Sequence, residues 1–396
     1  MFSLNFLTRR PALVAIASLL LSATANAATV VSASKRATTC NGYNELCERS
    51  YGNVTFVGAH DSYAIGNITN AFVNQDQDVT TQLNDGIRML QMQAHENNGV
   101  ITLCHSSCSL LNGGTLEDYL KKVKTWMDGN PNEVLTLLIV NIQNLPASRY
   151  DAVFKATGLD QISFVPESSP LTATAWPTLG SLIDKGTRLV TFLDNQADPS
   201  SAPYLIDEFT NMWETEFNVV DIARFDCSVN RTKGDTSTQL FTVNHFFNQV
   251  IATFPAPFPA KANVTNAASG EGSVGVHLGV CQSKMGRSPN FLLLDVSLPS
   301  VPVVPSLKLK FLRQFYEFAG TAPFEVAATA NGLTYNGKSI ASPRSSSNGS
   351  GSGSNGGSGS GNSNNGNNGA FGMKTPGLLL SVALTGFIGT VFAVLL

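Results

Sequence analysis

Short apolar segments rich in β-branched residues alternate along the chain with segments of helical period. Strands that alternate with helices predict βα units arranged around a parallel sheet, and therefore an α/β fold. Six such apolar segments are found, at residues 54–58, 88–92, 134–140, 188–193, 240–243 and 291–294.

Helix signals lie between these segments. Thr115 begins a sequence that resembles a capping box, and the helix it opens is predicted to run to Asp128 and to end at Gly129-Asn-Pro131. Further helices are expected over 148–158, 178–185 and 306–319. The region from about 40 to 330 is long for a single domain unless the fold is a large barrel or sandwich. One (β/α) barrel fits both the length and the alternation.

Polar residues gather at the carboxyl ends of the predicted strands. In a (β/α) barrel this face carries the active site, which is built from several strand ends. For any single Asn or Asp, a position where a strand meets a loop is the commoner explanation, but it accounts less well for the whole set. The set is His60, Asp61, Gln91, Gln93, Asn141, Asp194, Asn244, His245 and Asp295.

Two histidines in this region have distinctive surroundings. His60 lies in Gly-Ala-His-Asp-Ser-Tyr after one apolar segment, and His105 lies in Leu-Cys-His-Ser-Ser-Cys after another. A lone histidine is more often structural. Two of them suit the cleavage of a phosphodiester through an adjacent hydroxyl, because that reaction needs a base for the hydroxyl and an acid for the leaving alkoxide, and imidazole titrates near neutral pH.

These blocks resemble the X-domain of phosphatidylinositol-specific phospholipases C, and in particular the fungal-type, glycosylphosphatidylinositol (GPI)-anchored phospholipase C-like phosphodiesterases. The resemblance covers about residues 40–320 in ordered blocks. They are Val-Thr-Phe-Val-Gly-Ala-His60-Asp-Ser-Tyr, Asp85-Gly-Ile-Arg-Met-Leu, Leu-Cys-His105-Ser, the helix at 115–129 with Asn130-Pro-Asn-Glu-Val-Leu, Trp176-Pro-Thr-Leu, Val243-Asn-His245-Phe and Pro289-Asn-Phe-Leu-Leu-Leu-Asp295.

The resemblance implies an irregular TIM barrel and specific roles. His60 would be the general base on the inositol 2-hydroxyl, and His105 the general acid on the departing diacylglycerol oxygen, giving a cyclic inositol phosphate. Asp61 would lie beside the phosphate. Asp295 would orient His60, because a carboxylate on the far ring nitrogen fixes the tautomer and stabilises the imidazolium. Substrate contacts are expected from Gln91, Gln93, Asn141, Asn244 and His245.

The chain departs from the family at Gln91 and Gln93. Members place either an arginine or calcium-binding carboxylates on this strand, whereas a neutral amide donates a hydrogen bond without net charge. Losing such a charge costs on the order of 10² to 10³ in rate. No cofactor is expected. Calcium in particular is not expected, because the acidic ligands that it prefers are missing. Arg88 should face away from the glutamines by strand alternation, and His95 and His277 are interpreted as structural or exposed.

Six cysteines in an exported chain favour disulfides over metal ligation. Spacing suggests two local bridges and one long one, although spacing alone leaves the pairing open. The suggested pairs are Cys40 with Cys47, Cys104 with Cys108, and Cys227 with Cys281.

Both ends carry targeting patterns. Residues 1–27 have the basic, apolar and small-residue order of a secretory signal peptide. Residues 345–370 are a Ser/Gly/Asn-rich stalk, and 371–396 a short spacer with an apolar tail, which is typical of GPI attachment at Asn367 or Asn368 and less so of a tail-anchored span. We therefore expect a surface protein held at the outer face of the plasma membrane or cell wall.

Glycosylation sequons begin at Asn53, Asn67, Asn230, Asn263 and Asn348.

The net charge of −3 argues against a nucleic-acid partner, and the sequence does not determine the oligomeric state. Three functions remain. The first is a phosphodiesterase acting on an inositol phospholipid or a related glycerophosphodiester. The second is a catalytically weak or inactive barrel that binds inositol phosphates, lipid headgroups or wall glycans. The third is a glycosidase, which would need two carboxyl groups about 5 to 10 Å apart, and Glu214 and Glu216 are the close pair.

Overall fold

The structure is a computed structural model that describes residues 36–66, 70–258, 261–295 and 320–337. These residues all belong to one compact unit. The predicted signal peptide, stalk, tail and GPI attachment residues lie outside the described residues. The helix expected over 306–319 does so too.

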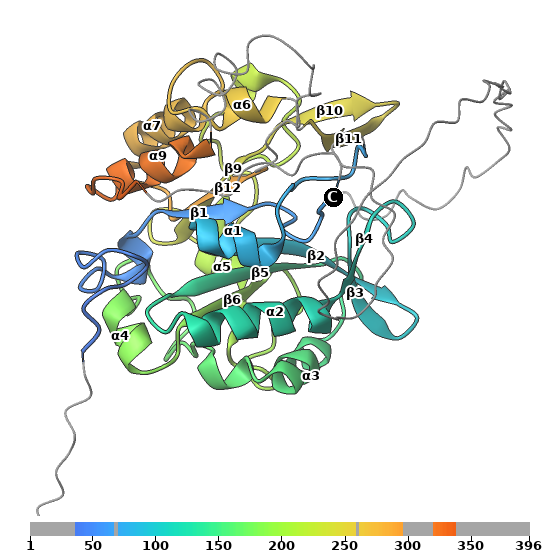
Figure 1. The fold of residues 1–396 in the computed structure, drawn as a ribbon, viewed down its shortest axis with the longest axis vertical. Helices are drawn as coiled ribbons and strands as arrows, with labels where there is room; N and C mark the ends of the chain where they lie inside the picture. The colour runs from blue at the N-terminus through green and yellow to red at the C-terminus, as the bar shows by residue number, and fades with distance from the viewer. Residues whose placement is uncertain (1–35, 67–69, 259–260, 296–319, 338–396) are drawn as a thin grey trace, which may run out of the picture. The chain divides into compact units, whose positions relative to one another are not determined.

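The described residues form an α/β barrel whose eight parallel strands follow the chain order (Figure 1). All consecutive strands except one pair are hydrogen-bonded to each other, and the last strand pairs with the first. Between β7 and β8 no pairing occurs among the described residues, so the TIM barrel is irregular, as expected. The barrel strands are β1 (Phe56–Ala59), β2 (Met89–Asn97), β5 (Leu135–Asn141), β6 (Leu189–Leu193), β7 (Leu205–Asp207), β8 (Met212–Glu214), β9 (Leu240–His245) and β12 (Phe291–Leu294).

All six predicted strands are present, with ends shifted by up to a few residues. The pattern misses β7 and β8 because each has three residues and only the four-residue helix α5 (Glu208–Asn211) separates them. Segments this short show no periodicity. Two antiparallel additions were also missed: β3 (Val100–Cys104) with β4 (Asn112–Thr115), and β10 (Asn248–Ile251) with β11 (Phe254–Pro257).

Helix α2 begins as the capping pattern predicts, because the Thr115 hydroxyl accepts a hydrogen bond from Asp118 N. The helices predicted at 148–158 and 178–185 correspond to α3 and α4. The helices are α1 (Val79–Asp85), α2 (Leu116–Gly129), α3 (Ala147–Thr157), α4 (Leu179–Asp184), α6 (Ala262–Thr265), α7 (Val274–Met285) and α9 (Ala322–Ala330), with 3₁₀ turns η1 (Tyr51–Asn53), η2 (Asp160–Ile162) and η3 (Ile222–Arg224).

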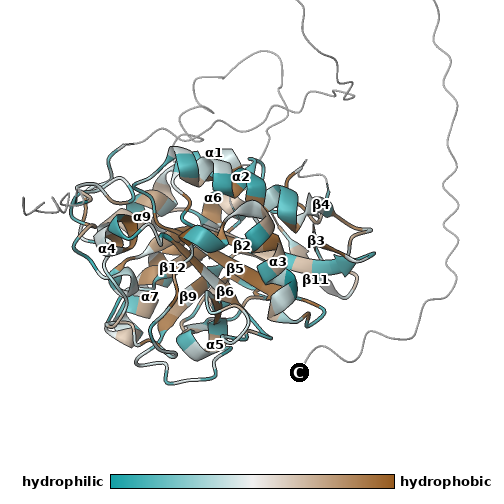
Figure 2. Cartoon of the chain, turned by 90° about the horizontal axis from the view of Figure 1, so that it is seen from below, coloured by the Kyte–Doolittle hydropathy of each residue, from teal (hydrophilic) through white to brown (hydrophobic). Residues whose placement is uncertain are grey.

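Alternation along the strands divides the apolar core into two clusters, and the strands accordingly form the most apolar part of Figure 2. One cluster fills the barrel, with Phe56, Leu138 and Phe291 among its members. The other contains the intervening strand residues and the side chains of the covering helices, such as Leu137 and Tyr150. Because successive side chains point to opposite faces, the same alternation decides which polar residues at the strand ends face the inside of the barrel.

Three disulfides join Cys40 to Cys47, Cys104 to Cys108 and Cys227 to Cys281, the pairs that spacing suggests. Among the described residues, no helix combines the length and apolar character that crossing a bilayer requires.

Candidate active site

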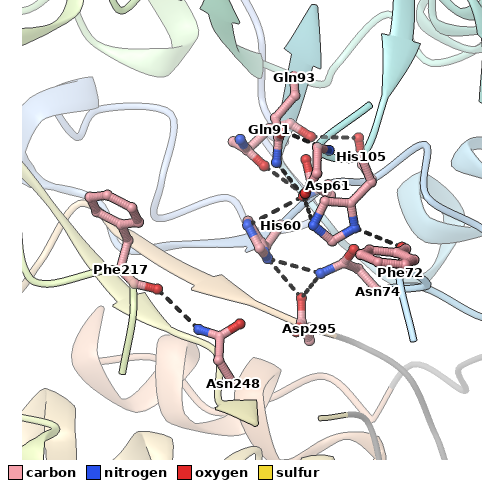
Figure 3. A network of polar contacts seen from close by, with 12 residues as sticks. His60, Asp61, Phe72, Asn74, Gln91, Gln93, His105, Phe217, Asn248 and Asp295 are labelled. Atoms are coloured by element: carbon pink, nitrogen blue, oxygen red, sulfur yellow. Dashed lines mark hydrogen bonds and ion pairs between the residues drawn. The ribbon is translucent and has the colours of Figure 1, made fainter. Parts of the chain in front are cut away.

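His60 directly follows β1 and lies beside Asp295, which directly follows β12. The register of the two strands pairs Ala59 with Leu294 and so brings the next residues together. His60 Nδ1 lies 2.8 Å from Asp295 Oδ1, and the Asn74 amide donates to the same oxygen at 2.9 Å (Figure 3). The Phe246 ring stacks on the imidazole, with the ring centres 3.6 Å apart. The ring of His60 is therefore fixed on one face and at one nitrogen.

Asp61 lies between the two histidines with its side chain fully buried. Its Oδ2 is 3.5 Å from His60 Nε2 and 3.5 Å from His105 Nε2. The backbone of Asp61 has a φ of +41°, a left-handed conformation that Asp and Asn adopt more readily than most residues. This turn brings the carboxylate back toward the mouth of the barrel, where it faces both rings.

His105 is brought to the site by a β-hairpin that the sequence pattern did not predict. Strand β2 extends beyond the barrel, and β3 runs back antiparallel to it, so His105 follows a strand outside the barrel order. Its Nδ1 lies 2.7 Å from the carbonyl oxygen of Phe72, and the Cys104–Cys108 disulfide closes the loop that carries it. The hairpin thus brings a second imidazole to the same place as His60.

The hydrogen bonds fix the protons of both rings. A carbonyl can only accept, so His105 carries a proton on Nδ1, and the Asp295 carboxylate likewise favours a proton on His60 Nδ1. Each ring then presents its Nε2 atom to the Asp61 carboxylate. Burial acts to lower the pKa of His60, but the Asp61 and Asp295 carboxylates outweigh it and raise that pKa above its ordinary value.

Gln91 and Gln93 both contact Asp61. The Gln91 side-chain oxygen accepts from Asp61 N at 2.6 Å, and the Gln93 amide donates to Asp61 Oδ2 at 2.9 Å. Gln93 also accepts from Ser106 N at 3.3 Å, which connects it to the His105 loop. The two glutamines therefore hold Asp61 as well as lying at the site.

Asn141 and His245 were expected in the site, and the structure places both elsewhere. They fall on the outward-facing positions of β5 and β9, as strand alternation from Ile139 and Val243 dictates. Asn141 is bonded to Leu145 and to the Tyr150 hydroxyl of α3, and the fully buried His245 is bonded to Thr265 and His277. The alternation of side chains along each strand would have excluded both residues from the site.

Asp194, which directly follows β6, also serves the wall of the barrel. Its carboxylate accepts hydrogen bonds from the backbone N–H of Asn141 and from the Asn195 amide. Burial raises its pKa above the ordinary value, and these two hydrogen bonds oppose that shift. The carboxylate therefore ties the ends of β5 and β6 together.

Asn244 occupies an inward position, where its amide donates to Glu214 and to the carbonyl of Thr215. Glu214 is in turn paired with Arg231, whose guanidinium lies over the rings of Phe209 and Phe217. The Glu214 carboxylate is close enough to act on the pKa of His60. Sequence reasoning gave no role to Asn74, Phe246 or Arg231. Phe246 lies within one of the blocks that resemble the family, but Asn74 and Arg231 carry no motif.

His95 and His277 are both buried. His95 shares the inward face of β2 with the two glutamines. Burial lowers its pKa, Asp61 opposes that shift, and His105 adds to it. The interpretation of His95 as structural or exposed, drawn from its lack of a motif, therefore overlooked its position beside the site.

Arg88 is placed as predicted, away from the glutamines, where it pairs with Glu133. Glu214 and Glu216 do not act together, because Glu214 is buried against Arg231 while Glu216 pairs with Arg224.

Three sequon asparagines, Asn53, Asn230 and Asn263, are exposed, and Asn67 and Asn348 lie outside the described residues. Glycosylation stays a prediction.

The Cys104–Cys108 disulfide yields a test of how the His105 loop is held. Replacing both cysteines by serine is expected to lower catalytic activity about tenfold or more while costing only about 2 kcal/mol of stability, because the closed loop is short. The matched control is the Cys40–Cys47 pair, a similar local bridge in the N-terminal segment. Equal activity in the two double variants, measured beside their melting temperatures, would contradict the expectation.

Residues 46–299 match the protein family described as "PI-PLC X 1", and the chain belongs to that family. Membership suggests a phosphodiesterase-type function.

Among its relatives, the "PI-PLC X domain-containing protein 1" of Arthroderma benhamiae is 43% identical over 259 residues, covering 65% of this chain and 84% of the relative. An "Uncharacterized secreted protein" of the same organism is 42% identical over 311 residues, covering 76% of this chain but 65% of the relative's own length. A solved phosphatidylinositol-specific phospholipase C from Listeria monocytogenes is 15% identical, with a TM-score of 0.43 over 63% of this chain and 90% of that one.

Proposed function

We propose that this protein cleaves a phosphodiester in an inositol phospholipid or a related glycerophosphodiester. His60 Nε2 takes the proton of a hydroxyl adjacent to the phosphate, and the hydroxyl oxygen attacks phosphorus. His105 Nε2 gives its proton to the departing alkoxide as the phosphorus–oxygen bond breaks. The products are a cyclic phosphate and a free alcohol. Both histidines end the step with their protons exchanged and return to the starting state through solvent.

The convergence of the two imidazoles carries this proposal. Both Nε2 atoms lie 3.5 Å from one carboxylate oxygen of Asp61, while the opposite nitrogen of each ring is held by Asp295 or by the Phe72 carbonyl. A structural histidine needs only one such partner. Two rings aimed at one point supply the base and the acid that the reaction requires.

The deciding assay offers purified protein phosphatidylinositol, lysophosphatidylinositol and glycerophosphoinositol, each with EDTA or with calcium. We expect phosphorus-containing cyclic products in both conditions. Products that form only with calcium would contradict the assignment of Gln91 and Gln93, because no carboxylate replaces the family's ligands there.

A second candidate function is binding without turnover, and the glutamines favour it. Their side chains carry no net charge, and both already contact Asp61, Gln91 as an acceptor and Gln93 as a donor. Saturable binding of inositol phosphate to wild-type protein, with no product from any of the three substrates, would establish this function in place of catalysis.

We also propose that the protein is held at the cell surface, with residues 1–27 removed as a signal peptide and 371–396 exchanged for a GPI anchor at Asn367 or Asn368. The stalk 345–370 would then carry the domain at 40–330 close to lipids like its substrate. Deleting 371–396 is expected to move most of the protein from the membrane fraction to the medium, measured by immunoblot. Retention of the shortened chain would count against the anchor.

A further inference from the structure

Two buried histidines meet on the outer side of the barrel, close to the proposed site. His245 is the last residue of β9 and His277 lies in α7, and their Nδ1 atoms are 2.9 Å apart. His245 Nε2 lies 2.8 Å from the Thr265 carbonyl oxygen, and His277 Nε2 lies 2.7 Å from the Asp226 carbonyl oxygen. The pair thereby joins β9, α6, α7 and the segment after η3.

The number of protons in this arrangement is fixed by its partners. Each carbonyl oxygen only accepts, so each Nε2 must carry a proton. A neutral imidazole has one proton, so two neutral rings would face each other with bare Nδ1 atoms at 2.9 Å, which is repulsive. The contact between the rings is a hydrogen bond only if one Nδ1 is protonated. The three contacts together therefore require three protons on two rings.

Both ends of this arrangement lead to the proposed base. Phe246, the residue after His245, stacks on His60 with the ring planes 6° apart. Asn266, the residue after Thr265, donates to the backbone carbonyl of Asp295 at 3.0 Å. Asp295 in turn holds His60 Nδ1, as Figure 3 shows. A shift of His245 or Thr265 therefore acts on the next residue, Phe246 or Asn266, and through it on His60 or on Asp295.

We propose that His245 and His277 share one extra proton, and that this proton-linked pair positions His60 through Phe246 and Asn266. The catalytic consequence rests on the function proposed above, whereas the shared proton does not. His245 and His277 are positioning residues, since they touch no reacting atom. When the extra proton leaves, one of the three hydrogen bonds is lost and one of the joined segments is released.

The surroundings set the direction of the pH dependence. Burial lowers the pKa of both rings, and the charge of His277 lowers the pKa of His245 further. The Asp226 carboxylate opposes this by raising the pKa of His277. Lys284, which also lies in α7, lowers the pKa of Asp226. The Phe225 ring contacts both imidazoles. The pair therefore gains its proton as the pH falls and loses one bond as the pH rises.

The first test needs no activity. In the full chain labelled with ¹⁵N-histidine, a pH titration by NMR should find His245 and His277 taking up a single shared proton, coupled to both Nδ1 atoms, below the titration of His60. The ring protons of His60 should shift in the same step, because Phe246 moves relative to them. Independent titration of the two rings, or a His60 signal that ignores the step, overturns the proposal.

The second test separates the shared proton from packing. In His277→Asn the amide nitrogen can donate to a bare His245 Nδ1 at any pH, whereas His277→Leu keeps bulk without a donor. We expect His277→Leu to lower kcat/KM about tenfold. At the acid end of the profile, where the wild-type pair is protonated, His277→Asn should match wild-type kcat/KM, and it should lose the pH step that the pair adds. Ser283→Asn, on the exposed part of α7, is the matched control.

The outcomes distinguish the two claims. Equal behaviour of His277→Asn and His277→Leu at equal melting temperature overturns the proposal. If no substrate is turned over, the proposed function fails, but the NMR titration still decides whether the proton is shared and whether it moves His60.

Discussion

Replacing His60 or His105 by asparagine should reduce kcat/KM for phosphodiester cleavage by about 10² to 10⁴-fold, the usual contribution of general acid–base catalysis. Asparagine keeps a polar group near the first side-chain nitrogen but removes Nε2, the atom that faces Asp61 in both rings. The measurement is initial rate against substrate concentration for each variant. Because the two groups act in one step, the double variant should lose little more than either single one.

A control for this result is the melting temperature, since both rings are largely buried and their loss could disturb the fold. The interpretation holds if the variants melt close to wild type while their rates collapse. A folded His105→Asn variant that keeps more than about a tenth of the activity would show that another group supplies the proton.

The change Asp61→Asn should lower the rate on the order of 10²-fold and move the acid limb of the pH–rate profile to lower pH. Asparagine tolerates the left-handed backbone at this position, so the change removes charge and leaves the turn intact. Asp61 raises the pKa of His60, and the base is active only when unprotonated. Removing the carboxylate lowers that pKa, so the base becomes available at lower pH.

The check is a kcat/KM profile across the acid range, recorded beside an NMR titration of His60. Asp295→Asn is the informative companion, because Asp295 also raises the pKa of His60 but bonds to the opposite nitrogen of the ring. Both variants should shift the titration in the same direction. An unchanged limb in Asp61→Asn would mean that His60 is not the base.

The barrel and the core of its site could be predicted from the sequence, for a physical reason. Long buried strands leave apolar runs, and the residue after such a run stands at the barrel mouth, as His60 and Asp295 do. Strands of three residues leave no pattern, so β7 and β8 were missed. The choice of face was the main error: His245 and Asn141 were assigned by position in the chain, when alternation from their apolar neighbours directs them outward.

Contacts between distant loops could not be predicted. Asn74 reaches Asp295 from 221 residues away in the chain, and Phe246 stacks on His60 only because β9 and β1 flank the same strand, β12. The place of the glutamines beside His60 was predicted, and their contact with substrate stays a prediction. Their bonds to Asp61 depend on a backbone turn that no residue pattern signals.

The unpaired boundary between β7 and β8 gives the described sheet two free edges, and β1 and β2 lie at its middle. Opening fluctuations begin where hydrogen bonds are fewest, which is at edges. The boundary between β7 and β8 is therefore where we expect the described sheet to open most readily, whereas β1 and β2, which lead to His60 and the glutamines, are paired on both sides. For protein engineering, this makes β7, α5 and β8 the segments in which sequence changes should disturb the geometry around His60 least.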